Sequence, residues 1–124
     1  MLQVLPASGA APVLDAERLH VYRAAVEFQG LAAGLLVSAP ASLRDQLDRA
    51  SVSVVLNVAE GAGRRSRRDK RRFYSIARGS AMECAAVLEV LRVRRVATEE
   101  ECRQGRALVV RIVQMLTKLE QAMG

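Results

Sequence analysis

Hydrophobic residues recur at alternating three- and four-residue intervals along most of the chain, the spacing of amphipathic helices. Three short breaks divide the pattern into four segments. Helices joined by such short connections pack antiparallel, so the predicted fold is an all-α, up-down-up-down four-helix bundle. The bundle domain would cover residues 15–124, after a disordered, proline-containing arm over residues 1–14. The helices are predicted at about residues 15–37, 43–62, 66–95 and 98–123.

Each predicted helix has one apolar stripe that should face the core. The second helix is also apolar elsewhere, at Val52, Val55, Leu56 and Ala59, so we expect it to be buried on more than one side. A strand over residues 52–58 is discounted, because no second strand exists to pair with it. The four stripes are Leu19, Tyr22, Val26, Ala33, Leu36; then Leu43, Leu47, Ala50, Val54, Val58; then Phe73, Ala77, Ser80, Cys84, Val87, Leu91; and last Cys102, Gly105, Val109, Ile112, Leu116, Leu119, Met123.

Polar residues and glycines mark the expected helix ends. Gly61 and Gly63 suit a left-handed C-cap after the second helix. In the last two helices an acidic residue follows the N-cap three positions later, as in a capping box. The expected N-caps are Asp15, Ser42, Ser66 and Thr98.

The composition excludes several classes of protein. Hydrophobic residues make up 51% of the chain, but aromatic residues only 3%, so the core must be aliphatic. One histidine and two cysteines are too few for a zinc or di-iron site, so we expect neither metal nor cofactor. Cys84 and Cys102 lie within helical patterns as free thiols, which fits a cytoplasmic protein. The sequence predicts neither a secretory signal nor a membrane span.

The whole net charge of +6 lies in residues 64–72, which hold seven basic residues and one acid. Arginine predominates there, and its guanidinium group binds phosphate in a bidentate manner. Since few aromatic residues accompany this segment, the sequence predicts contacts with the backbone of RNA or DNA rather than base recognition. The predicted nucleic-acid-binding residues are Arg64, Arg65, Arg67, Arg68, Lys70, Arg71, Arg72 and Arg78.

Three other interpretations of the charged residues remain open. The basic segment, residues 64–72, could be a solvated face that keeps the protein soluble, or it could dock an acidic protein partner. A small helical enzyme is the third, with an anion site formed by arginines as in helical chorismate mutases; its candidates are Arg44, Arg49, Arg78 and Glu83. A catalytic triad would have to use His20, which no motif supports, so we predict no enzymatic activity.

A block of residues in the second and third helices resembles a known bacterial family. The block contains Asn57-Val58-Ala59-Glu60-Gly61, Gly63-Arg64-Arg65-Ser66 and Ala77-Arg78-Gly79-Ser80-Ala81-Met82-Glu83. This family of four-helix-bundle proteins includes those encoded by intervening sequences of 23S rRNA genes and the accessory variability protein of diversity-generating retroelements. The resemblance implies a ring-like homopentamer and, for the retroelement members, binding to nucleic acid and a reverse transcriptase. The residues that form the motif here are Arg49, Asn57, Glu60, Gly61, Gly63, Ser66, Gly79, Ser80 and Glu83.

Two polar residues of this motif need partners on physical grounds. Asn57 lies inside an apolar helix and must form hydrogen bonds, so we expect it to fix the packing register. Glu60 lies near a helix C-terminus, where the helix dipole disfavours a carboxylate. It should therefore pair with Arg49, Arg64 or an arginine of the third helix. Both residues are interpreted as structural rather than catalytic.

Overall fold

The structure, a computed structural model, describes residues 13–124 and contains only helices over that range. The predicted all-α class and four long helices are confirmed, whereas the predicted arm over residues 1–14 lies almost wholly outside the described residues. A short 3-10 helix, η1, precedes the long ones. The elements are η1 (Asp15–Arg18), α1 (His20–Leu36), α2 (Ala41–Gly63), α3 (Arg67–Val93) and α4 (Glu99–Met123).

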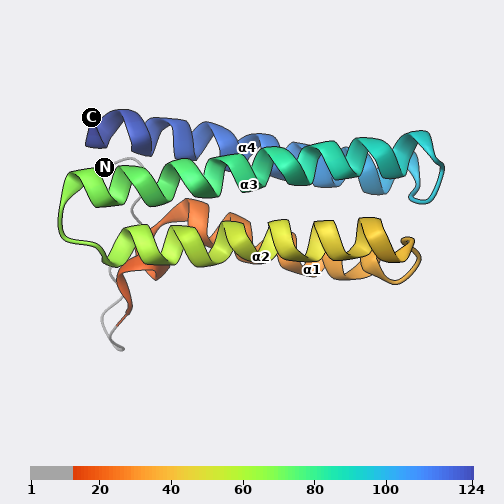
Figure 1. The fold of residues 1–124 in the computed structure, drawn as a ribbon, viewed down its shortest axis with the longest axis horizontal. Coiled ribbons are helices and arrows are strands. Elements are labelled where there is room, and N and C mark those ends of the chain that lie inside the picture. Colours follow the sequence, from red (N-terminus) through yellow and green to blue (C-terminus); the bar gives the residue numbers. More distant parts are fainter. Residues whose placement is uncertain (1–12) are drawn as a thin grey trace.

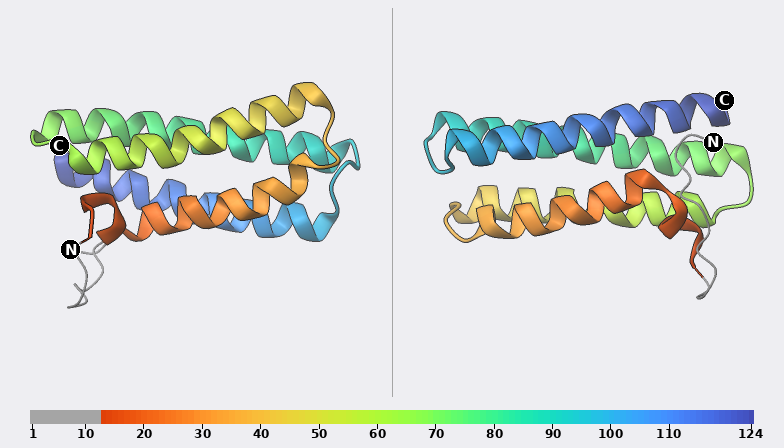
Figure 2. Two further views of the ribbon diagram at one scale, coloured as in Figure 1. Left: turned by 90° about the horizontal axis from the view of Figure 1, so that it is seen from below. Right: turned by 180° about the vertical axis from the view of Figure 1, so that it is seen from behind.

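The four long helices lie side by side and alternate in direction (Figure 1). Helix α3 packs between α2 and α4, and α1 closes the bundle by contacting both α2 and α4 (Figure 2). The connection between α2 and α3 lies at the same end of the bundle as the C-terminus of α4 (Figure 1). The basic segment, residues 64–72, is therefore at one pole of an elongated molecule.

The core is aliphatic, as the composition predicts. The predicted stripe of α2 is buried along its whole length, and so are five of the seven predicted positions of α4. The last two, Leu119 and Met123, are half-buried and pack against the same core. Regular three- and four-residue spacing therefore predicted the buried faces of α2 and α4 correctly.

The predicted stripe of α1 is rotated from the observed one. Val26 and Ala33 are exposed, whereas Phe28 is buried. A second stripe with the same spacing runs along this helix, and burying the large ring of Phe28 removes more apolar surface from water than burying Val26 does. The stripe that faces the core consists of Val21, Ala25, Phe28, Ala32 and Leu35.

The core face of α3 is also shifted from the prediction. Tyr74 is buried with 3% of its surface exposed, whereas Phe73 and Ser80 are only half-buried. Burial, together with the carboxylate of Asp15, raises the pKa of Tyr74. Ala77, Cys84, Val87 and Leu91 are buried as predicted. Three buried residues that the prediction did not include complete this face, and they are Tyr74, Ala81 and Leu88.

Two of the four predicted N-caps are confirmed and two are wrong. The hydroxyls of Ser66 and Thr98 each accept a backbone N–H bond, at 3.0 Å. Asp15 instead lies inside η1, and α2 begins after Pro40 rather than at Ser42. Proline serves at that position because its fixed φ leads into the helix while its carbonyl accepts the first helical bond, from Arg44 N at 2.8 Å.

The predicted glycine C-cap of α2 is wrong as well. The helix continues through Gly63, and none of the glycines in residues 13–124 has a positive φ. The side chain of Lys70 instead donates to two of its terminal carbonyls. Within residues 13–124, the residue with a left-handed backbone conformation is Arg95, which follows α3.

Candidate nucleic-acid interface

The basic segment forms the α2–α3 connection and the first turns of α3. Ser66 starts the helix by accepting the backbone N–H of Asp69, so Arg67 is its first residue. The N-terminus of α3 thus adds its partial positive charge to the same pole. All six arginines of the segment are exposed, and Lys70 is half-buried.

Lys70 is bound within the protein. Its ammonium nitrogen Nζ donates to the carbonyl oxygens of Gly61 at 3.3 Å and Ala62 at 2.8 Å. These are terminal carbonyls of α2, where a cation also opposes the negative end of the helix dipole. The lysine therefore performs the capping role that the sequence assigned to the glycines, and it contributes little to an external site.

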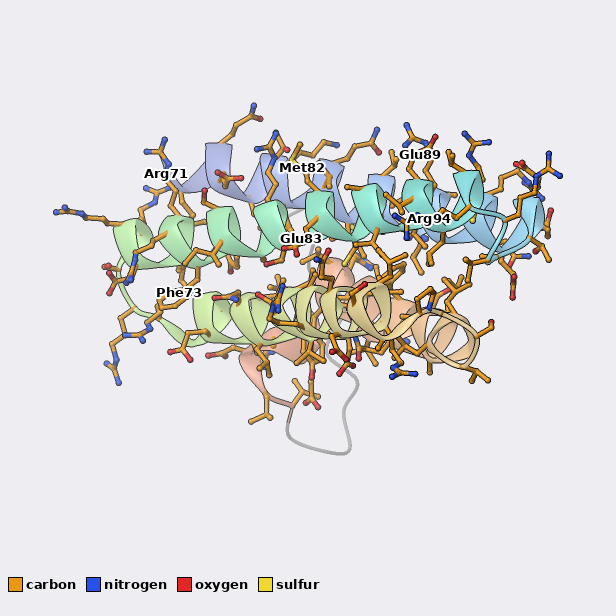
Figure 3. The ribbon with its side chains drawn as sticks, turned by 45° about the vertical axis from the view of Figure 1, so that its right-hand side comes forward. Arg71, Phe73, Met82, Glu83, Glu89 and Arg94 are labelled. Atoms are coloured by element: carbon orange, nitrogen blue, oxygen red, sulfur yellow. The ribbon has the colours of Figure 1, made fainter. Side chains whose placement is uncertain are left out.

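Arg64 and Arg72 are held against the ring of Phe73. Their guanidinium carbons lie 4.8 and 5.2 Å from the ring centroid, within the range of cation–π attraction. Arg64 also pairs with Glu60 at 2.7 Å, so this is the partner that Glu60 takes among the three predicted. Phe73 lies on the side of α3 that faces α2 (Figure 3), where it braces two arginines beside the connection.

Three further arginines of the predicted set lie toward α4. Arg67 Nη2 donates to the Ala122 carbonyl at 2.9 Å, and the guanidinium of Arg71 lies against Gly124. Arg78 Nε donates to the Thr117 hydroxyl at 2.9 Å and lies 3.9 Å from a carboxylate oxygen of Glu120. Glu120 neutralises Arg78 locally, so this residue belongs to the seam between α3 and α4 rather than to a free stripe.

Arg65 and Arg68 are the most available cations of the segment. Both are exposed, and within residues 13–124 neither side chain makes an ion pair or hydrogen bond. The eight predicted binding residues therefore share one pole but not one role. Arg65 and Arg68 are free, whereas the other six contact protein groups.

The motif residues of α2 and α3 form a polar link across the half-buried edge of their interface. Asn57 Nδ2 donates to the Ser53 carbonyl at 2.9 Å and to the Ser53 hydroxyl at 3.0 Å. The Ser53 hydroxyl lies 2.8 Å from that of Ser80 on α3. Arg49 pairs with Glu83 at 3.6 Å, also between the two helices. The Ser53–Ser80 and Arg49–Glu83 contacts cross from α2 to α3, whereas both hydrogen bonds of Asn57 stay within α2. Gly79 is exposed beside them.

The four residues of the alternative anion site are not brought together. Arg49 and Glu83 pair with each other between α2 and α3, but Arg78 points to α4. Arg44 lies five residues before Arg49, on a different face of α2. A separate cavity of about 290 Å³ between α3 and α4 is lined by three arginines, yet three glutamates balance them. Its charged lining residues are Glu89, Arg92, Glu99, Glu100, Arg103 and Arg106.

Neither a metal site nor a membrane span is found in the described residues. In residues 13–124 no three acidic, histidine or cysteine side chains come together as metal ligands. No helix of this region combines the length and apolar character that crossing a bilayer requires. Both cysteines are buried and free. Burial, together with the carboxylate of Glu83, raises the pKa of Cys84 to about 12, so its thiol stays protonated and unreactive.

The sequence prediction missed a set of basic residues on α4. Residues 102–119 include four cations and no acid, and all four cations are exposed. The sequence contains a signal for them, because acidic residues are absent from residues 102–119. Outside residues 64–72 the acidic and basic residues are equal in number, so the total charge does not reveal this local excess of basic residues. They are Arg103, Arg106, Arg111 and Lys118.

Comparison with known proteins adds one result. A family model described as 23S rRNA-intervening sequence protein matches residues 17–118, which is most of the chain. The match begins within η1 and ends near the C-terminus of α4, so it spans all four helices. No curated protein matches the chain.

Proposed function

The chain belongs to the 23S rRNA-intervening sequence protein family, and from its basic pole we propose that it is a non-enzymatic, self-associating protein that binds nucleic-acid backbones. The observation that carries this proposal is the collection of six exposed arginines around one helix N-terminus. Phosphate oxygens can accept hydrogen bonds from both the guanidinium groups and the backbone N–H groups of the helix N-terminus. Neither contact depends on base sequence. The two free, buried thiols agree with a place in the cytoplasm.

An acidic protein is a weaker candidate for this pole. Protein interfaces depend on buried aromatic and aliphatic anchors at their centre. Tyr74 is buried in the core, and the half-buried ring of Phe73 is already flanked by two arginines. Contacts with phosphate need no such anchor, so the charge and the small apolar content of this surface favour nucleic acid.

The direct experiment measures nucleic-acid binding by the purified protein. Freshly purified protein should carry nucleic acid, visible in its ultraviolet absorbance ratio, and a high-salt wash should remove it. Fluorescence anisotropy should then show a dissociation constant that rises steeply with KCl concentration. Protein that carries no nucleic acid and leaves labelled RNA and DNA unbound at low salt would refute the proposal. Capture of an acidic protein under the same conditions would favour the alternative.

Self-association is supported by a second apolar seam on the outside of α3. Its positions follow steps of 3-4-3-4-3, the spacing of a helix that docks another helix. All six positions are exposed, and no side chain of residues 13–124 lies within 4 Å of the position that a Cβ on Gly79 would take. Leu56 and Val52 of α2, 61% and 37% exposed, extend this apolar surface. Five of its positions are small or apolar, and the sixth, Glu83, is charged and pairs with Arg49. The seam consists of Ile76, Gly79, Glu83, Ala86, Val90 and Val93.

We propose that this seam docks a second copy of the chain, and the family resemblance favours five copies in a ring. Light scattering at micromolar concentration should therefore return an oligomer. Val90→Glu should dissociate it by placing an unpaired carboxylate among the apolar positions of the seam, since the carboxylate already there, Glu83, is paired with Arg49. Val110→Glu on α4 is the matched control, since Val90 and Val110 are 36% and 37% exposed. A parent protein that is monomeric, or a Val90→Glu variant that keeps the parent's size, would refute this arrangement.

A further inference from the structure

Two cations on the outer surface of α4 lie apart from the glutamates of the α3–α4 cavity. Of the four exposed cations of this helix, Arg103 pairs with Glu100 at 2.7 Å. Arg106 makes no ion pair or hydrogen bond within residues 13–124, but it lines that cavity together with three glutamates, whereas the hollow beside Arg111 contains one, Glu27. Within residues 13–124, Arg111 and Lys118 make no ion pair and no side-chain hydrogen bond. They are therefore free to bind an external anion.

Arg111 and Lys118 share one face of α4. Seven residues are two helical turns, so these side chains point the same way about 10 Å apart along the axis. A shallow hollow of about 180 Å³ lies between them, and Gln114 and Met115 complete its lining. A continuous surface thus joins the two cations.

Arg67 continues this line to the basic pole. Its guanidinium Nη2 binds the carbonyl of Ala122, which is one turn beyond Lys118 and about 6 Å further along α4. Arg111, Lys118 and the guanidinium of Arg67, which is bound at the C-terminal end of α4, span about 16 Å along the helix axis and are here called the α4 row. It connects the middle of the bundle with the exposed arginines at the start of α3, Arg65 and Arg68.

We infer that the α4 row is a second contact surface for double-helical nucleic acid, continuous with the basic pole. The inference rests on the proposed function and extends it. Helix α4 contains no aromatic residue, so it cannot stack the unpaired bases of a single strand. Cations spaced along one helix suit regularly spaced phosphates, and about 16 Å corresponds to about five base pairs. Val110 is the large aliphatic side chain of α4 that is exposed, which leaves little apolar anchor for a protein partner.

The test compares two double variants with the same net charge. Arg111→Gln/Lys118→Gln removes two cations of the α4 row. Arg44→Gln/Arg94→Gln removes two exposed arginines at the opposite end of the bundle and is the matched control. Binding to a 20-base-pair DNA duplex, to the equivalent RNA duplex and to one single strand of each is measured against KCl concentration. Thermal unfolding confirms that both variants are folded.

The α4-row variant should bind duplex more weakly than the control, with the slope of log K against log salt flattened by about 1.8, or 0.9 per lost phosphate contact. Its loss on single strands should be smaller. A slope equal to that of the control, or a loss confined to single strands, would overturn the inference. If an Arg65→Gln/Arg68→Gln variant binds duplex more weakly than the parent while the α4-row variant binds like the parent, only the inference about the α4 row fails. If the parent binds no nucleic acid, both this inference and the proposed function fail.

Discussion

Gly61 on α2 lies so close to Tyr74 on α3 that a Cβ at Gly61 would be 2.8 Å from Cε1 of the ring. The same atom would lie 3.1 Å from Cβ of Phe73. Tyr74 is buried and cannot swing away, so the absence of a side chain at Gly61 sets how closely α3 approaches α2. This contact holds the start of α3, and with it the arginines of the basic pole.

We therefore expect Gly61→Ala to lower the free energy of unfolding by about 1–3 kcal/mol, the usual cost of overpacking a core. Gly63→Ala is the matched control, because no atom outside its own segment lies within 4 Å of the position its Cβ would take. That change should stabilise the protein by about 0.4–1 kcal/mol by restricting the unfolded chain. Urea unfolding followed by circular dichroism measures both values. Equal effects at the two glycines would contradict the close-approach role of Gly61.

Arg95 provides a second test of backbone geometry. Its φ of 57° lies in the left-handed region, where a side chain costs about 1–2 kcal/mol. The hydrogen bonds Val96 N to Leu91 O at 2.9 Å and Arg95 N to Arg92 O at 3.1 Å form a Schellman motif, whose left-handed residue is usually glycine.

Arg95→Gly should raise the free energy of unfolding by roughly 0.5–1 kcal/mol, because relief of the left-handed strain exceeds the entropy that glycine adds to the unfolded chain. Arg94→Gly, at the neighbouring position with an ordinary φ of −80°, should lower it by a similar amount. Thermal and urea unfolding of the two variants measure the difference. An Arg95→Gly variant less stable than the parent would show that the arginine side chain stabilises this turn.

Much of the bundle could be predicted from the sequence, because a single stripe per helix determines which side is buried. The stripe of α2 and the seam of α4 were found in this way. Phe73 and Tyr74 are adjacent aromatic residues, and periodicity alone could not choose between them. The choice depends on the space left by Gly61 on another helix, which is tertiary information. For the same reason, no sequence signal placed the left-handed turn at Arg95 instead of at a glycine.

The site was predicted less completely than the fold. The sequence identified the segment in which the net charge is concentrated, since charge density along a short segment needs no knowledge of packing. It could not tell which cations are already bound. Lys70 and Arg78 find their partners in α2 and α4, up to 42 residues away in the chain, and such contacts depend on how the helices dock.

Stability should fall at alkaline pH because of the buried thiol of Cys84. Its pKa is about 12 in the folded protein, whereas the unfolded chain loses this proton near pH 8.5. Between these values the unfolded state binds fewer protons, so the free energy of unfolding decreases as pH rises, by at most about 1.4 kcal/mol per pH unit. The raised pKa of Tyr74 adds a contribution of the same sign above about pH 10.

Urea unfolding at several pH values between 8 and 11 measures this slope for the parent and for Cys84→Ala. The variant loses packing and should be less stable throughout, but its stability should fall less with pH. Parallel curves for the two proteins would contradict burial of a protonated thiol at this position. Stability of both proteins should be little changed between pH 7 and 8, where the thiol is protonated in both states.

Lys70 and Arg68 lie in the same turn of α3 but should have different roles, Lys70 in stability and Arg68 in binding. Arg68 is exposed, and in residues 13–124 its side chain has no protein partner, whereas Lys70 donates to two carbonyls at the end of α2. Arg68→Gln should leave the free energy of unfolding within about 0.5 kcal/mol of the parent. It should flatten the salt dependence of duplex binding by about 0.9, corresponding to one phosphate contact.

Lys70→Gln removes the same charge but should have the opposite pattern of effects. It should destabilise the protein by about 1 kcal/mol, since it weakens the bonds to the α2 carbonyls, and it should leave the salt slope near that of the parent. Urea unfolding and anisotropy titrations at four salt concentrations measure both quantities for each variant. Equal salt slopes for the two variants would mean that the pole attracts nucleic acid through its total charge, with no individual contact at Arg68.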